Sequence, residues 1–219
     1  MTFYLYAIAE AIERVDEVSG VTGEPLRILT LGGLDVVAAQ VATPPSLSAQ
    51  TLAAQDQVVR HLHAHAEALL PMRFGAAFAS EAQMTRALEL RAPALRDQLA
   101  VVRGKEQMTL RLLGAQGAHG AQGAAGATAV TAMTGVEYLR GRAAKGTPRE
   151  IVPLLDAMES HVRARRVEPG RAPGLVATVY HLVDRGTSAE YAAALHAAAR
   201  AMPELVIRAS GPAPCYAFT

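Results

Sequence analysis

Three histidines, His61, His63 and His65, have the residue type and spacing that come closest to a metal site in this chain. A helix is expected here, and helical residues two apart point about 160° from each other, because each residue turns about 100°. His61 and His63 therefore cannot share an ion, whereas His61 and His65 are four apart and could. No glutamate directly follows His61 and no third ligand is evident nearby. The pattern favours a polar helix face and predicts no metal site.

The other patterns that could carry chemistry are incomplete. Glycine recurs at every third position from Gly114 to Gly126, which matches neither a dinucleotide fingerprint nor a Walker sequence. No Gly-x-Ser-x-Gly elbow of a serine hydrolase is present. Cys215 stands between Pro214 and Tyr216 with no adjacent histidine, so a bystander cysteine is the better interpretation. The sequence thus predicts no catalytic residues, no cofactor and no enzyme.

Composition narrows the class of protein. The chain has 219 residues, of which 51% are hydrophobic and 19% charged, as is typical of a globular protein with one large or two small domains. A formal net charge of +1 gives no electrostatic case for nucleic acid, and Arg163, Arg165 and Arg166 fall at a predicted helix end. Cys215 is the single cysteine, which favours a reducing cytoplasm. No apolar run approaches the roughly 18 residues of a membrane span, so no membrane insertion is expected.

The first half of the chain predicts strands followed by helices. Strands are expected at 3–8, 26–31 and 34–41, and Gly32-Gly33 predicts a tight hairpin between the last two. From Leu52 the apolar residues recur with helical period through Leu69, and Pro71 should end that helix. Gln55 falls on its apolar face as the one polar residue.

Two more helices are expected before a boundary. Ser80-Glu81-Ala82-Gln83 has the form of a capping box for a helix to about Leu90, and Pro93 should start another that reaches Leu99. Arg103-Gly104 indicates a domain boundary.

The second half predicts the order strand, helix, strand, strand, helix, strand. The predicted strands lie at 107–113, around 166–167, at 175–183 and at 205–209, and a flexible Gly/Ala insertion is expected at 114–134. One helix is expected to begin at Thr147, and Pro153 should either kink it or mark its true start. A second helix is expected to be capped at Thr187. That βαββαβ order is typical of a ferredoxin-like domain. The fold class is therefore α+β with two domains. Residues 1–103 form the smaller α+β unit with a hairpin and helices, and 104–219 form the ferredoxin-like domain with insertion 114–134 and tail 211–219.

Arg73 lies in the apolar stretch Leu69-Leu70-Pro71-Met72-Arg73-Phe74-Gly75. An arginine there is expensive to bury unless it is paired. One hypothesis is an internal ion pair with Glu106 or Asp97. The other is an anchor for the carboxylate or main chain of a partner.

Several short motifs, in order, resemble the GvpL/GvpF family of gas vesicle proteins. They are Tyr4-Leu5-Tyr6, Pro71-Met72-Arg73-Phe74-Gly75, Gly104-Lys105-Glu106, Tyr138-Leu139, Leu182-Val183 and the terminal Gly211-Pro212-Ala213-Pro214-Cys215-Tyr216-Ala217-Phe218. The terminal motif departs from the family at Ala213, where tryptophan is usual, at Cys215 and at Ala217. The remaining residues, Gly211, Pro212, Pro214, Tyr216 and Phe218, are expected to form a rigid tail folded back on the protein. Together with Arg73, Phe74 and Gly75 they are the candidate partner-binding residues.

The resemblance implies a non-enzymatic accessory protein, in the cytoplasm and associated with gas vesicles. Its partners would be the hydrophobic shell protein and other accessory proteins, and its role assembly or a minor structural one. One alternative is a ferredoxin-like ligand-binding protein or enzyme, which would require a closed pocket holding His181, Tyr180 or Arg73. Another is a regulatory module whose segment 114–134 orders on binding.

Overall fold

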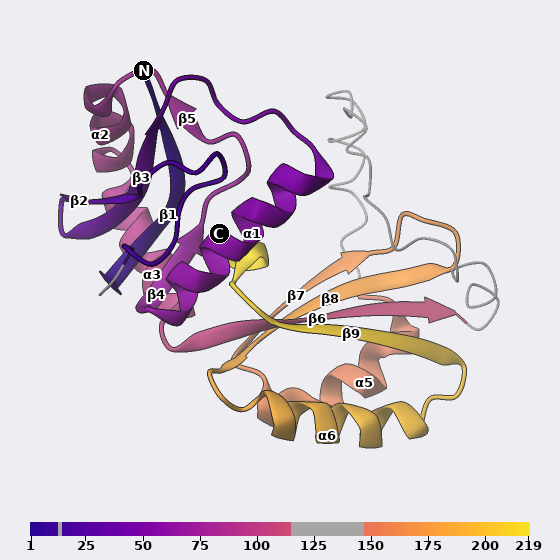
Figure 1. Ribbon diagram of the computed structural model, residues 1–219. Coiled ribbons are helices and arrows are strands. Elements are labelled where there is room, and N and C mark those ends of the chain that lie inside the picture. The colour runs from indigo at the N-terminus through magenta and orange to yellow at the C-terminus, as the bar shows by residue number, and fades with distance from the viewer. Residues whose placement is uncertain (13–14, 115–146) are drawn as a thin grey trace. The chain divides into compact units, whose positions relative to one another are not determined.

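The computed structural model describes residues 1–12, 15–114 and 147–219 (Figure 1). It is a mixed α+β protein with two antiparallel sheets, and the described chain divides into two compact units. Unit 1 comprises Met1–Gln107 together with Ala213–Thr219, and unit 2 comprises Met108–Pro212. Residues 115–134 of the expected insertion, and Tyr138-Leu139, lie outside the described residues.

The sheet of unit 1 is built around its first strand. It has the order β2-β3-β1-β4, with β5 also paired to β1. The strands are β1 (Thr2–Ile12), β2 (Arg27–Leu31), β3 (Leu34–Val41), β4 (Ala66–Pro71) and β5 (Ala77–Phe78). The β2–β3 hairpin is confirmed: Leu31 pairs with Leu34 across Gly32-Gly33, and both glycines have positive φ, 58° and 79°.

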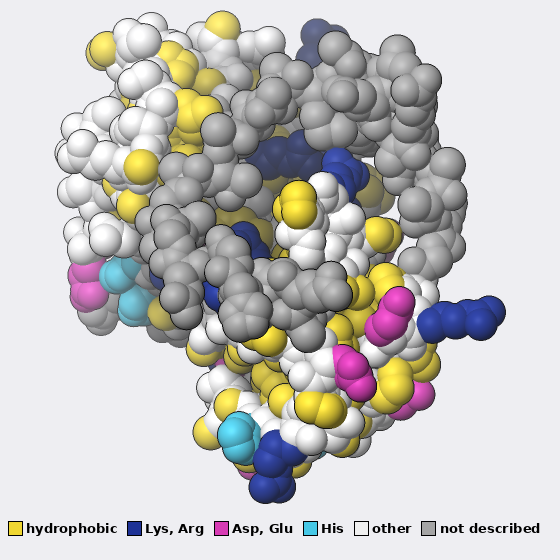
Figure 2. Space-filling model, turned by 90° about the vertical axis from the view of Figure 1, so that its right-hand side faces the viewer, with side chains coloured by type: hydrophobic (Ala, Val, Ile, Leu, Met, Phe, Trp, Pro, Cys, Tyr) yellow, Lys and Arg dark blue, Asp and Glu magenta, His cyan; other side chains and the backbone are white. Residues whose placement is uncertain are grey.

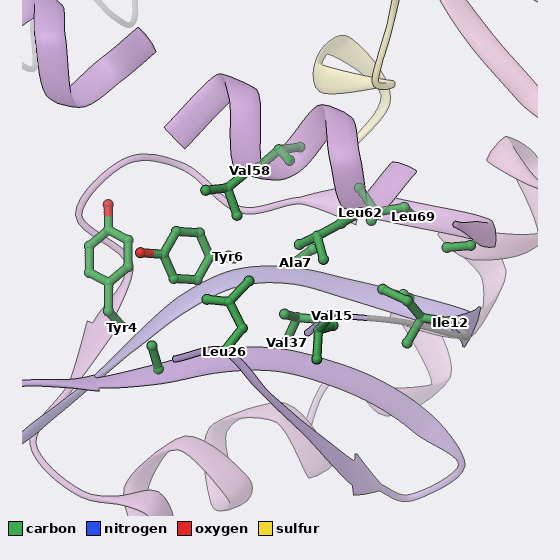
Figure 3. Packing of buried hydrophobic residues seen from close by; sticks show 14 of the residues in the cluster. Tyr4, Tyr6, Ala7, Ile12, Val15, Leu26, Val37, Val58, Leu62 and Leu69 are labelled. Carbon is green, nitrogen blue, oxygen red and sulfur yellow. The ribbon is translucent and has the colours of Figure 1, made fainter. Parts of the chain in front are cut away.

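Helices cover both faces of this sheet. They are α1 (Ala49–Ala64), α2 (Glu81–Glu89) and α3 (Ala92–Val102), with α1 on one side of the sheet and α2 and α3 on the other (Figure 1). On the α1 side, Val58 lies over Tyr6 and Leu62 lies over Ala7 of β1, all within one hydrophobic cluster (Figure 3). Because both faces are covered, β1 is buried almost continuously from Phe3 to Ala9.

The predicted helix from Leu52 to Leu69 is too long. In the structure α1 ends at Ala64, and the following residues form β4, which pairs with β1 from Ile12↔Ala66 to Ala7↔Pro71. Pro71 therefore ends a strand. Five of the six residues of β4 are buried, among them Ala66 (4%), Ala68 (0%), Leu69 (1%) and Leu70 (1%). The apolar residues Leu62, Ala66 and Leu69 keep the helical spacing across this boundary, so the spacing alone does not separate the strand from the helix.

Two of the predicted helix starts, at Ser80 and at Thr187, differ in whether the side chain caps the helix. Ser80 does cap α2, since its Oγ accepts from Gln83 N (3.2 Å), and Gln83 Oε1 accepts from Ala79 N (2.9 Å). Thr187 is the N-cap residue of α6, as predicted, but its side chain forms no capping hydrogen bond with the helix. Its hydroxyl donates to Asp184 O (2.7 Å) within the preceding turn, so it does not accept from the helix.

Unit 2 is one four-stranded sheet with the order β7-β8-β6-β9. Its elements are β6 (Lys105–Gly114), α5 (Val152–Ala157), β7 (Ala164–Pro169), β8 (Leu175–Asp184), α6 (Ser188–Arg200) and β9 (Leu205–Ala213). The helices α5 and α6 lie on the same face of the sheet (Figure 1), where Leu110, Leu155 and Leu195 belong to one hydrophobic cluster. Pro153 is in the first turn of α5, so it stands at the true helix start.

Two predicted assignments change in this unit. The arginines expected at a helix end lie just before β7 or within it, and Arg163 and Arg166 form surface ion pairs with Asp184 and Glu168. The tail was expected to belong wholly to the second domain, but its residues Ala213–Thr219 belong to unit 1. The first segment of unit 1 ends at Gln107, whereas the sequence indicated a boundary at Arg103-Gly104.

Candidate functional site

The Pro71–Gly75 motif forms a turn at the edge of unit 1. After β4, Met72 N donates to Tyr6 O (2.9 Å), and Ala76 N donates to Arg73 O (3.1 Å), which closes a four-residue turn. Gly75 occupies the third position of this turn with φ of 85°, a backbone conformation that favours glycine in type II turns. The chain then rejoins β1, because Leu5 N donates to Ala76 O (2.8 Å). The turn therefore projects from the edge of the sheet between β4 and β5.

The side chain of Tyr4 holds this turn through hydrogen bonds. Its hydroxyl accepts from Gly75 N (3.0 Å) and donates to Gln55 Oε1 (2.5 Å), and Gln55 Nε2 donates to Met72 O (3.1 Å). Burial raises the pKa of Tyr4 above its usual range, so the phenol keeps its proton. The ring of Phe74 packs edge-on against Tyr4 with centroids 6.2 Å apart. Gln55, the polar exception on the predicted apolar face, is thus the buried group that ties α1 to the turn.

The C-terminal tail folds back onto the same unit, as predicted. Pro214 and Cys215 are buried, and residues Tyr216–Phe218 form a short 3₁₀ helix. The hydroxyl of Tyr216 donates to Asp56 Oδ1 on α1 (2.8 Å). The backbone N–H of Ala217 donates to Gln107 Oε1 (2.8 Å). Asp56 also pairs with Arg60 one helical turn away (2.6 Å).

The central and terminal motifs meet at one hollow of about 310 Å³. Its wall is formed by Leu52, Gln55, Asp56, Met72, Arg73, Phe74 and Tyr216. A second hollow of about 470 Å³ is lined by other apolar side chains of unit 1, among them Leu70, Phe78, Leu88 and Leu95, and by Arg91 and Thr219. Met72 and Arg73 line both, so the turn separates two largely apolar hollows. Of the predicted partner-binding residues, Arg73, Phe74 and Tyr216 come together here.

Arg73 does not form the expected internal ion pair. Its side chain is exposed, and within the described ranges no ion pair joins it to Glu106, Asp97 or any other carboxylate. The turn carries it out of the sheet edge, so it avoids the cost of burying a charge. It leaves an arginine guanidinium beside an apolar hollow, a combination that suits a partner with an apolar side chain and a carboxylate or carbonyl oxygen.

The other expected candidates are not brought to this hollow. Phe218 is half-buried, while Gly211 and Pro212 are exposed at the end of β9 and belong to unit 2. His181 and Tyr180 are neighbours on β8, so their side chains point to opposite faces of the sheet. His181 is fully buried with Nδ1 2.8 Å from the hydroxyl of Tyr191, and Tyr180 donates to Glu168. His181 and Tyr180 therefore do not face one pocket, and neither lines the two hollows described above, whereas Arg73 lines both.

The charge pattern agrees with the low net charge. On the face shown in Figure 2, basic and acidic side chains of the described residues are interspersed with hydrophobic ones. Among the described helices, none is both long and apolar enough to cross a membrane.

The chain matches the gas vesicle synthesis protein GvpL/GvpF family over residues 2–219. It therefore belongs to that family and is a gas vesicle protein. A search among curated proteins found no match.

Two solved structures share the fold. The crystal structure of the gas vesicle protein GvpF from Anabaena sp. PCC7120 matches with a TM-score of 0.76 at 14% identity, covering 99% of this chain and 95% of that one. The crystal structure of GvpF from Microcystis aeruginosa matches with a TM-score of 0.75 at 14% identity, covering 99% and 98%. The whole described architecture thus recurs despite the low identity.

Proposed function

We propose that this chain is a non-enzymatic accessory protein that assists assembly of the gas vesicle shell, or forms a minor part of it, by contacting the hydrophobic shell protein. It would act in the cytoplasm, at the growing vesicle. The observation that carries the proposal is the meeting of two family motifs at one hollow, where Arg73, Phe74 and Tyr216 form part of the wall.

The hollow fits a partner segment that is mainly apolar. Leu52, Met72 and Phe74 offer hydrophobic surface, and Leu52 and Tyr216 are 43% and 39% exposed. Burying such surface against a second protein is favourable at about 25 cal/mol per Å² of apolar area. Arg73 would add direction by binding a carboxylate or carbonyl oxygen at the rim. Arginine and aromatic side chains are the residue types that most often dominate protein interfaces.

The tail completes this surface in the proposal. Ala213 stands where the family usually has tryptophan, so this chain lacks one aromatic anchor, and Tyr216 is the aromatic residue that the tail contributes to the wall of the hollow. We therefore assign the shell contact to the turn and Tyr216 together, with Asp56 holding Tyr216 in place.

We also propose that the two compact units are two domains and that unit 2 is ferredoxin-like. Its sheet order β7-β8-β6-β9, with α5 between β6 and β7 and α6 between β8 and β9, supports that assignment. The fold by itself carries no function, so the proposed contact rests on unit 1.

Co-purification with the shell protein tests the proposal. Arg73→Ala and Tyr216→Ala are each expected to weaken retention about tenfold, because each removes an anchor from the hollow. Arg86→Ala, at an exposed position of α2 that lines neither hollow, is the matched control and should bind as the unaltered chain does.

Deletion of the gene in a vesicle-forming host tests the role itself. The proposal expects absent or altered vesicles. Normal vesicles in the deletion strain, or shell-protein retention that none of the variants weakens, would contradict it.

A further inference from the structure

A second cluster of polar side chains lies elsewhere in unit 1, at the C-terminal end of α1. His61 is in the last turn of that helix and His65 is its C-cap. The fold brings Glu17 to them from the turn that follows β1. One ligand atom from each of the three side chains, an imidazole nitrogen or a carboxylate oxygen, lies within 4.8 Å of the others. The sequence predicted no metal site, because Glu17 lies more than 40 residues before His61 and the spacing of the histidines gives no sign of it.

Glu17 is held in position by buried neighbours. Val15 is 7% exposed and belongs to the hydrophobic cluster of the α1 face, and Val18 packs against the same cluster. Val18 N also donates to Val15 O (3.4 Å). These contacts anchor the turn on both sides of Glu17, while Glu17 itself is exposed. The turn that carries Glu17 is therefore fixed beside the two histidines.

The two imidazoles are already oriented. His65 Nδ1 lies 2.8 Å from His61 O. A carbonyl only accepts, so Nδ1 carries the hydrogen and Nε2 keeps the lone pair that a metal needs. This is the hydrogen bond that metal-bound histidines usually make through their other nitrogen.

His61 adds two further observations. Its Nε2 is buried and, among the described residues, has no hydrogen-bond partner. The two rings lie near each other, with centroids 4.5 Å apart and planes tilted by 33°. A buried polar nitrogen without a partner is costly, and a bound ion at this cluster would remove the need for one.

We propose that Glu17, His61 and His65 form a binding site for a zinc-type dication, with water completing the coordination. Two imidazole nitrogens and one carboxylate oxygen suit Zn²⁺ or Co²⁺, whereas Mg²⁺ and Ca²⁺ prefer oxygen ligands alone. The site also lies at a helix C-terminus, whose partial negative charge favours a cation. Zn–N bonds of about 2.0 to 2.1 Å require the three ligand atoms, now within 4.8 Å of one another, to draw closer on binding. The bound ion would tie the turn after β1 to the end of α1.

Metal titration of the full chain, purified without a histidine tag and treated with chelator, tests the site. Co²⁺ is the probe, because its visible spectrum reports nitrogen and oxygen ligands, and Zn²⁺ should compete for it. We expect one Co²⁺ per chain, and at least about tenfold weaker binding for His61→Gln, His65→Gln and Glu17→Gln. His196→Gln, an exposed histidine on α6, is the matched control and should bind as the unaltered chain does.

Thermal unfolding supplies a readout that is independent of the spectrum. Zn²⁺ should raise the unfolding temperature of the unaltered chain and of His196→Gln, and leave that of His61→Gln unchanged. Circular dichroism without metal checks that each variant is folded. Absence of stoichiometric binding, or binding that survives His61→Gln with His65→Gln, would overturn the site. Unchanged affinity in Glu17→Gln would overturn the three-ligand assignment.

Discussion

The buried histidine of unit 2 gives a quantitative test of the fold through pH. His181 on β8 is 0% exposed, and burial, with a smaller contribution from the positive charge of Arg165, lowers its pKa from 6.5 to about 4. Arg165 is its direct partner across the β7–β8 pair. Protonation of His181 therefore has to place a positive charge in a buried site near the positive charge of the exposed Arg165.

The sign and size of the effect follow from linkage. Because the pKa is lower in the folded state, His181 binds a proton more readily when the chain is unfolded, and acid destabilises the protein. The contribution is fully present above pH 6.5 and is lost as the pH falls toward 4. The difference between a pKa of 6.5 in the unfolded chain and about 4 in the folded one corresponds to a total contribution of about 3 kcal/mol to the free energy of unfolding. Between pH 7 and pH 4.5, the contribution of His181 should fall by about 2.5 kcal/mol.

Urea denaturation at several pH values, compared between the unaltered chain and His181→Asn, isolates that contribution. Asparagine does not titrate, and its amide can still hydrogen-bond the hydroxyl of Tyr191, which lies 2.8 Å from Nδ1 of His181. The difference in unfolding free energy between the two chains should narrow by about 2.5 kcal/mol from pH 7 to pH 4.5. His196→Asn, on the exposed face of α6, controls for removal of a histidine as such.

Two results would refute the reasoning. One is a pair of stability curves that stay parallel from pH 7 to pH 4.5. The other is an NMR titration of His181 with a midpoint near 6.5, which would mean that solvent reaches the imidazole. Either would revive the alternative in which this histidine serves a ligand site.

Three further predictions concern unit 1. Tyr4→Phe should lower the free energy of unfolding by about 2 kcal/mol in urea denaturation, because Gln55 Oε1 loses its buried donor and Gly75 N its acceptor; a loss below about 0.5 kcal/mol would contradict this. Gly33→Ala should cost about 1 kcal/mol in the same assay, since its φ is 79° and no atom crowds a Cβ there; an unchanged midpoint would refute the strain argument. Tyr216→Phe, which loses the donor to Asp56, should speed carboxypeptidase release of the last residues about fivefold, as expected for about 1 kcal/mol of local stability; an unchanged rate would show that this bond does not hold the tail.

The parts of the fold that the sequence predicted are those with local signals. The β2–β3 hairpin follows from Gly32-Gly33 alone, and the start of α2 follows from Ser80 and Gln83. The strand at 175–183 was predicted because β-branched, aromatic and other apolar residues predominate in it, and the structure extends it only to Asp184. In each case the residues that determine the element lie within a few positions of one another.

The boundary between α1 and β4 could not be predicted in that way. Leu62, Ala66 and Leu69 continue a helical period, yet only Leu62 is in the helix. The end of α1 at Ala64 has no glycine cap or proline to mark it. β4 exists because β1 pairs with it and because helices cover both faces of the sheet, and neither cause is local.

The candidate site shows the same division between residue types and their neighbours. The motifs identified Arg73, Phe74 and Tyr216, but the hydrogen bonds that position them join residues far apart in the sequence. Tyr4 and Gln55 are 51 residues apart, and Asp56 and Tyr216 are 160 residues apart. The one available signal was Gln55, a polar residue on an otherwise apolar helix face, which a buried network explains.

This division also decides how the site should be tested. Tyr4 and Gln55 are buried and hold the turn, so their substitution changes the stability of the protein and the shape of the hollow together. Arg73 is exposed, and in the part of the chain that the structure describes no ion pair depends on it, so Arg73→Ala should leave the free energy of unfolding within about 0.5 kcal/mol of its value. A loss of shell-protein binding in Arg73→Ala at unchanged stability would therefore report contact itself, and the same loss in Tyr4→Phe would report only that the turn has moved.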